Sequence, residues 1–164
     1  MYYKFEDFPY FIKETLIYIF EDKAILEKIR VLKRPLPRYS LPLIQNIAGF
    51  TFGNRIYLTF YVAPTKECLS TLIHETVHVF QYKRGFVKFL IIYFYAYFKL
   101  MFTGKHDYSE IPCEVEAYEL QNAFNKAIEN VSFSQYHIWF EKNKYKLPKY
   151  KGENTCQKDG QLKK

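Results

Sequence analysis

The chain contains the stretch KECLSTLIHETVHVFQYKRG at residues 66–85, in which apolar residues recur at helical spacing. The residues on this apolar face are Leu69, Leu72, Ile73, Thr76, Val77 and Phe80. Thr65 suits the N-cap, and Glu67 lies in the first turn, where the helix dipole favours an acid. Gly85 suits the position just after a helix end. The sequence therefore predicts a helix over residues 66–84.

Two histidines and a glutamate, His74, Glu75 and His78, lie within this predicted helix in the pattern His-Glu-x-x-His. Residues four apart share one helix face, so the two imidazoles can bind one metal ion. In zinc hydrolases with this pattern, the glutamate acts as general base toward the attacking water. Gln81 falls on the same stripe as the histidines. In the alternative interpretation the histidines are only polar residues on a buried helix, and the glutamate at this spacing argues against it.

A cluster of glutamates occurs downstream, in the segment EIPCEVEAYE at residues 110–119. Pro112 suits the first turn of a helix, where acids are favoured, so a solvated helix start is one explanation of the cluster. In the other, one glutamate turns inward and completes a His/His/Glu site with an open fourth position. Glu116 is the first choice, because the small Ala117 beside it allows close approach of the two helices. Glu114 is the alternative, and spacing alone does not separate the two.

Four segments within roughly residues 45–125 resemble the gluzincin-type zinc metallopeptidases, and more narrowly the small HExxH metallopeptidases of bacteria and phages. They are a Thr-x-Gly-x-x-Ile-Tyr-Leu strand at 51–58, His-Glu-x-x-His-Val-x-Gln-Tyr at 74–82, an aromatic helix after a glycine at 85–102, and Tyr-x-x-x-Pro-x-Glu-x-Glu-Ala-Tyr at 108–118. The His-Glu-x-x-His element is the specific part, and the other three support it.

The resemblance implies a zincin-like fold, a bound zinc ion and peptide hydrolysis, without naming a substrate. It implies that His74, His78 and Glu116 are the metal ligands and that Glu75 is the base. Just before the acidic segment, His106 and Tyr108 are candidates to stabilise the oxyanion that forms during hydrolysis.

Length and composition indicate one domain, residues 1–148, followed by a basic tail, residues 149–164. The 164 residues suffice for a sizeable core, and 20% of them are aromatic. The tail has almost no apolar residues and is expected to be disordered. A net charge of +7 occurs without a recognisable nucleic-acid motif, so nucleic acid is not an expected partner.

The cysteines at positions 68, 113 and 156 are an odd number with no paired spacing, and no signal peptide is visible. We therefore expect reduced thiols and a cytoplasmic protein, with the phage virion or the membrane periphery as alternatives.

Residues 86–102 are almost wholly apolar or aromatic, interrupted by Lys88 and Lys99. The segment falls short of the roughly 20 apolar residues of a membrane-spanning helix. We expect a helix buried against the rest of the protein. The alternative is a peripheral membrane contact, in which the lysines lie at the interface beside the aromatic rings.

The remaining pattern predicts an α+β fold that is mostly helical, with a small β-sheet beside the metal-binding helix. Residues 8–32 have a helical pattern, residues 47–52 and 55–62 flank a Gly-Asn turn as in a hairpin, and residues 121–130 and 133–145 are also helical. The function expected is that of a zinc metallopeptidase with a peptide or protein substrate. The alternative is a non-enzymatic zincin scaffold, as a structural or binding component, and the sequence leaves the oligomeric state open.

Overall fold

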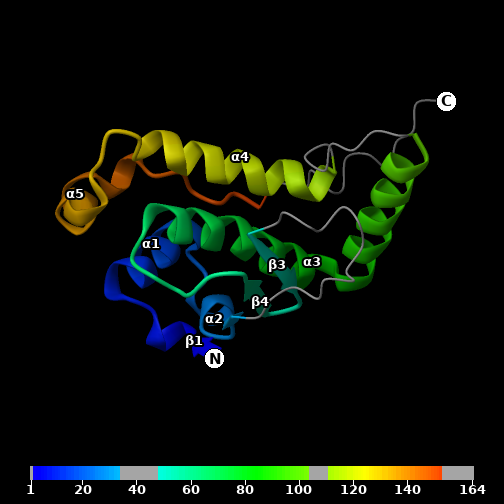
Figure 1. Cartoon of the computed structure of the whole chain (residues 1–164), viewed down its shortest axis with the longest axis horizontal. Coiled ribbons are helices and arrows are strands. Elements are labelled where there is room, and N and C mark those ends of the chain that lie inside the picture. The colour runs from blue at the N-terminus through cyan, green and yellow to red at the C-terminus, as the bar shows by residue number, and fades with distance from the viewer. Residues whose placement is uncertain (1, 34–47, 104–110, 153–164) are drawn as a thin grey trace.

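The structure is a computed structural model that describes residues 2–33, 48–103 and 111–152, and all structural statements below concern these residues. They form an α+β fold of five α-helices and a four-stranded mixed sheet, which packs against α3 (Figure 1). The α-helices are α1 (Tyr10–Phe20), α2 (Lys23–Leu26), α3 (Lys66–Thr103), α4 (Pro112–Ala127) and α5 (Tyr136–Asn143). The strands are β1 (Tyr2–Lys4), β2 (Arg30–Lys33), β3 (Gly49–Phe52) and β4 (Arg55–Leu58), and short 3-10 helices are η1 (Phe5–Asp7), η4 (Phe133–Gln135) and η5 (Lys144–Lys146).

The sheet has the strand order β1-β2-β4-β3, with β2 and β4 parallel and the other two pairs antiparallel. The predicted hairpin is present as β3 and β4, with Thr51 opposite Ile56. Gly53 has φ 63°, a left-handed conformation that glycine adopts without the cost of a Cβ, so the turn is explained locally. Along β3, Gly49 and Thr51 are buried and Phe52 is exposed, because successive residues face opposite sides of a strand.

The expectation of one helical region over residues 8–32 is only partly correct. α1 ends at Phe20, where Glu21 takes a left-handed conformation, and the short α2 is followed by strand β2. β2 pairs with β1 and with β4, which is more than twenty residues away in sequence. A short apolar run does not distinguish a strand from a helix. Here the run forms a strand because it pairs with the remote strand β4.

Helix α3 consists of two helical segments joined at Gly85, whose backbone is non-helical (φ 171°, ψ 86°). The first segment, residues 66–84, ends where the sequence predicted. Its apolar face is buried in the core between the sheet and α4; the fully buried side chains are Leu69, Leu72, Ile73, Val77 and Val79.

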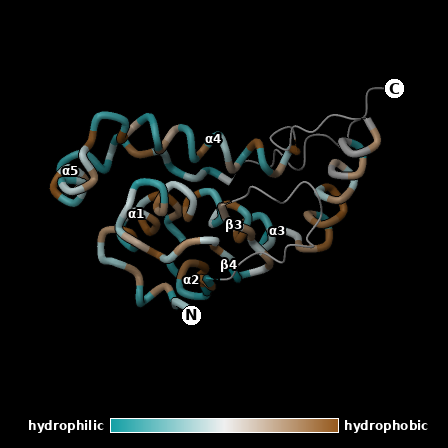
Figure 2. The backbone as a smooth tube through the Cα atoms, in the orientation of Figure 1, coloured by the Kyte–Doolittle hydropathy of each residue, from teal (hydrophilic) through white to brown (hydrophobic). Residues whose placement is uncertain are grey.

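The second segment, residues 86–103, is helical as predicted, but the expectation that it is buried is wrong. After the kink it leaves the body of the molecule at the end remote from α5, as Figure 2 shows. Phe89 is buried near Tyr82, Ile111 and Cys113, while Val87, Ile91 and several aromatic residues are exposed. The first segment already covers the sheet. The core formed by the described residues reaches only the part of the second segment next to the kink, around Phe89. No helix among the described residues is long and apolar enough to cross a membrane.

Residues 149–152, expected at the start of a disordered tail, lie against the core. The Lys149 ammonium group is 2.6 Å from a carboxylate oxygen of Glu21, and the Tyr150 amide donates to the Ile19 carbonyl. The Tyr150 ring packs against those of Phe20 and Phe80. Residues 149–152 are therefore part of the folded domain, and residues 153–164 lie outside the described part of the chain.

The expectation of reduced thiols is wrong for Cys113, which is disulfide-bonded. Cys68 is a free, buried thiol on α3. Sequence spacing gave no indication of the disulfide, because disulfide formation depends on which thiols the fold brings together.

Candidate metal centre

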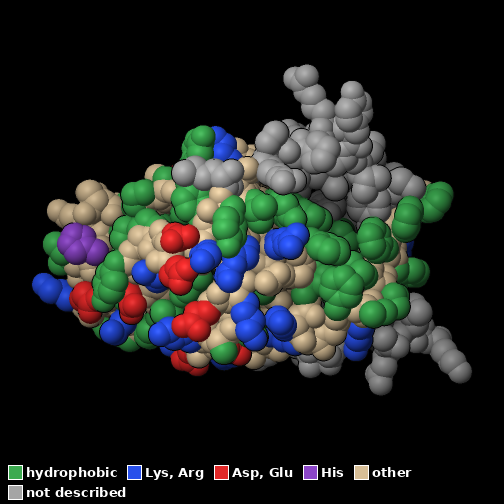
Figure 3. Space-filling view, turned by 90° about the horizontal axis from the view of Figure 1, so that it is seen from below, with side chains coloured by type: hydrophobic (Ala, Val, Ile, Leu, Met, Phe, Trp, Pro, Cys, Tyr) green, Lys and Arg blue, Asp and Glu red, His purple; other side chains and the backbone are tan. Residues whose placement is uncertain are grey.

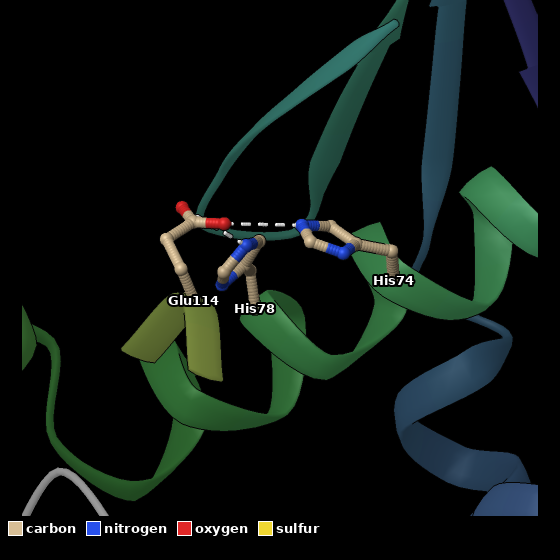
Figure 4. Close-up of side chains that lie close together, drawn as sticks. All are labelled: His74, His78 and Glu114. Carbon is tan, nitrogen blue, oxygen red and sulfur yellow. Dashed lines mark hydrogen bonds and ion pairs between the residues drawn. The ribbon is translucent and has the colours of Figure 1, made fainter. Parts of the chain in front are cut away.

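Two consecutive helices bring together three potential ligands that are up to 40 residues apart in sequence. The first segment of α3 places His74 and His78 on one face, and the N-terminal turn of α4 crosses it and contributes Glu114 (Figure 4). His74 Nε2 lies 3.2 Å from one carboxylate oxygen of Glu114, and His78 Nε2 lies 3.5 Å from the other. All three side chains are buried, and their ligand atoms lie within 4.8 Å of one another.

Each imidazole is oriented by a glutamine whose side chain contacts Nδ1, the ring nitrogen that does not face Glu114. His78 Nδ1 lies 2.8 Å from Gln81 Oε1, and the Gln81 amide nitrogen donates to Glu116 and to the Cys113 carbonyl, both at 3.0 Å. Because the amide nitrogen is used by these two acceptors, the amide oxygen must accept from His78 Nδ1. His78 Nε2 is then free of a proton in the neutral ring, with its lone pair available to a metal.

The same arrangement holds His74. Its Nδ1 lies 3.1 Å from Gln121 Oε1, and the Gln121 amide nitrogen donates to Ser70 Oγ at 3.0 Å. Both rings therefore direct Nε2 toward Glu114, and such outer partners are what orient metal-binding histidines.

The donor set fits a zinc ion. Two imidazole nitrogens and one carboxylate match the three protein ligands of catalytic zinc sites, and ligand atoms at tetrahedral angles around one zinc lie roughly 3.3–3.6 Å apart. The contacts of 3.2 and 3.5 Å between the imidazoles and Glu114 are close to that spacing. Unprotonated Nε2 atoms facing a buried carboxylate need a cation or protons between them. These three residues can thus hold a metal ion.

Glu116, the first choice for third ligand, lies elsewhere. Its carboxylate accepts from Gln81 and is 3.2 Å from an Arg84 guanidinium nitrogen, close to the end of the first segment of α3. Residues two apart on a helix point in different directions, so only one of the two glutamates reaches the histidines. The structure brings the alternative, Glu114, to them. Glu116 contacts Gln81 instead, and Gln81 in turn contacts His78.

Glu75 lies beside the triad without joining it. One carboxylate oxygen accepts a 2.7 Å hydrogen bond from the Thr51 hydroxyl on β3. A Cβ at Gly49 would lie 2.7 Å from the other oxygen, so glycine there leaves room for the carboxylate. Burial raises the pKa of Glu75, an effect that His78, His74 and Thr51 oppose only in part.

The metal-free triad is strongly coupled. Burial acts against the charged forms of His78 and Glu114, but Glu114 raises the pKa of His78 to about 9. The histidines in turn lower the pKa of Glu114 to about 2. Without a metal, His78 therefore holds a second proton at neutral pH and forms an ion pair with Glu114.

A cavity of about 270 Å³ opens between β3, α3 and α4, and the triad and Glu75 line it. Three residues at this cavity were not expected from the sequence: Tyr93, whose hydroxyl is 3.4 Å from Glu114, Tyr118, whose ring meets that of His74 edge-on at 4.6 Å, and Gln121. Glu114, Tyr118 and Gln121 recur at helical spacing along one face of α4, which was the available signal. His106 and Tyr108 lie outside the described residues.

Comparison with known proteins finds no match to this chain among protein-family models, curated proteins or solved structures. The assignment of function therefore depends on the site itself.

Proposed function

We propose that this chain is a zinc-dependent peptide hydrolase of zincin-like architecture, with His74, His78 and Glu114 as ligands and Glu75 as general base. The observation that carries the proposal is the buried His/His/Glu triad, in which Gln81 and Gln121 hold both imidazoles with Nε2 toward Glu114. The resemblance of residues 74–82 to the gluzincin pattern supports the same conclusion.

A zinc ion held there would supply Lewis acidity, polarising a substrate carbonyl and making water a stronger nucleophile at neutral pH. Glu75 accepts the proton of the attacking water and delivers it to the leaving amine. The buried position that raises its pKa suits this role, because a general base is most effective when its pKa is near the working pH. The Thr51 hydroxyl keeps the carboxylate at the wall of the cavity.

A polypeptide substrate suits the cavity because of the strand beside it. Among the described residues, β3 is one of the two edge strands of the sheet, and Gly49, Phe50 and Thr51 line the cavity. An edge strand presents unpaired backbone groups to which an extended peptide can add. Such a peptide would lie across the triad and Glu75, with a scissile carbonyl within reach of both.

A structural metal site is the second candidate, and one observation favours it. The three ligands are nearly inaccessible, with exposed fractions of 9% for His74, 6% for His78 and 5% for Glu114. In this case the ion would join α3 to α4 and no hydrolysis would occur.

One experiment separates the two candidates. The full chain is purified without added metal, analysed for bound elements, and screened with zinc against a broad peptide library. For the hydrolase, wild type binds one zinc per chain and cleaves, while Glu75→Gln retains zinc and cleaves about 10²–10⁴-fold more slowly. Equal rates for both zinc-loaded proteins contradict the mechanism. A zinc-loaded wild type that cleaves nothing supports the structural site, and absence of metal binding contradicts both.

A further inference from the structure

The second segment of α3 carries a continuous exposed apolar face. We call the set Val87, Ile91, Phe94, Tyr95, Phe98 and Phe102 the outer face. The exposed fractions of these side chains range from 48% for Phe94 and Phe98 to 81% for Phe102. They recur at intervals of three and four residues, so they lie on one side of the helix, while Phe89 on the other side is buried. In Figure 3 hydrophobic side chains gather at this end of the molecule.

We propose that the outer face docks on an anionic lipid surface, with the helix lying in the plane of the interface. A large exposed apolar face on a folded chain marks a site of contact with another molecule. Phenylalanine, tyrosine and isoleucine beside lysines have the composition of helices that bury one face at the boundary of headgroups and acyl chains.

The positive charge of this segment favours anionic lipid. From residue 76 to residue 106 the sequence has no Asp or Glu, and it has lysines at 83, 88, 99 and 105 and an arginine at 84. Lys83, Lys88 and Lys99 are exposed, and on the helix Lys88 and Lys99 lie beside one edge of the outer face. These cations can meet lipid phosphates while the neighbouring rings enter the interface.

Two other arrangements fit less well. At 1.5 Å per residue, residues 86–103 give a length of about 27 Å, but the lysines within it oppose a spanning orientation, in agreement with the absence of a spanning helix among the described residues. In a symmetric dimer the same surface of both copies meets, so two surfaces of like charge would come together. An anionic surface removes that repulsion.

Docking in this way would leave the cavity of the candidate metal centre on the side of the segment that faces away from the lipid. Phe89 and Tyr93, on the opposite side of the same segment, line the cavity of the candidate metal centre. The docking surface itself includes no residue of the triad, so membrane binding is independent of the proposed hydrolysis.

Vesicle flotation of the full chain tests the proposal. We expect wild type to float with vesicles of phosphatidylcholine and phosphatidylserine in equal amounts, and much less with phosphatidylcholine alone. The double variant Phe94→Gln/Phe102→Gln should lower the bound fraction about tenfold or more, since two exposed rings no longer enter the interface. Tyr10→Gln/Tyr145→Gln, which changes two exposed rings on α1 and η5, is the matched control and should float as wild type does.

Charge is tested separately with Lys83→Glu/Lys88→Glu, which should reduce flotation with the anionic vesicles, against Lys142→Glu/Lys146→Glu on α5 and η5 as control. Glu75→Gln should float as wild type, whether or not it cleaves peptides. The proposal is overturned if wild type floats with neither vesicle, or if both α3 double variants float unchanged. It is also overturned if wild type is a dimer that the phenylalanine substitutions dissociate without any flotation, because the outer face would then bind a second copy.

Discussion

At the scale of single residues, Glu114 and Glu116 show how position within a buried site assigns different roles to the same side chain. Both are buried on α4, and both contact side chains of α3. Glu114 meets the two Nε2 atoms, whereas Glu116 accepts from Gln81 and pairs with Arg84. Glu116 thus acts on His78 through Gln81, as a positioning residue.

This difference predicts unequal effects of the same substitution. Glu114→Gln removes a charged ligand and should lower zinc affinity by more than about 100-fold. Glu116→Gln disturbs only an outer partner and should lower it about tenfold, at the small end of the 10–100-fold typical of such residues. Zinc affinity is measured by competition with a chromogenic chelator, after circular dichroism has established that both variants fold. Loss of zinc in Glu116→Gln alone would restore Glu116 as the ligand.

At the scale of elements, the two segments of α3 differ in what supports them. The first packs its apolar face into the main core, between the sheet and α4. Among the residues that the structure describes, the second packs Phe89 and a few neighbours against Tyr82, Ile111 and Cys113. The stability of the fold therefore depends on the first segment far more than on the second, although the second is the more apolar of the two in sequence.

The chain offers a matched pair to measure this. Ile73 is fully buried in the first segment, and Ile91 is 63% exposed in the second. Ile73→Ala should destabilise the protein by about 2–5 kcal/mol, because it leaves a cavity in a packed core. Ile91→Ala should change stability by less than about 0.5 kcal/mol, as is usual for surface positions. Chemical denaturation of the zinc-free proteins gives both values, and equal losses would mean that the second segment is buried in solution.

At the scale of the whole molecule, the candidate metal centre links folding to pH and to metal. His78 and Glu75 both have raised pKa values in the fold, so the folded chain binds their protons more tightly than the unfolded chain does. Such groups stabilise the fold below their unfolded pKa, and that stabilisation is lost as pH rises through the folded pKa. Glu114 acts in the opposite sense, but only as pH falls from its unfolded pKa toward about 2.

The zinc-free protein should accordingly lose thermal stability as pH rises from about 5 to about 9. With zinc the trend should be weaker or reversed, because the metal binds the deprotonated imidazoles and its affinity grows with pH. Melting temperatures measured with a chelator and with excess zinc, at several pH values in this range, give the comparison. A zinc-free melting temperature that rises over the same interval would show that His78 and Glu75 do not hold these protons.

Local pattern accounts for a large part of the agreement between sequence and structure. The helix over residues 66–84 follows from its 3.6-residue periodicity and from Gly85 at its end. The turn at Gly53 follows from glycine's access to positive φ, and the placement of His74 and His78 on one face follows from their spacing of four. Each of these depends on residues within a few positions of one another, so the sequence by itself determined them.

The tertiary structure alone decided which glutamate reaches the histidines, which glutamines hold their Nδ1 atoms, and which side of residues 86–103 remains exposed. Glu114 and Gln121 come from α4, about forty residues beyond their partners on α3. Their meeting depends on the angle and register at which the two helices cross, and no local spacing encodes it. The exposure of the outer face has a similar origin. The apolar residues of a segment determine how much apolar surface it could bury, but the packing of the other elements determines which of those residues are buried.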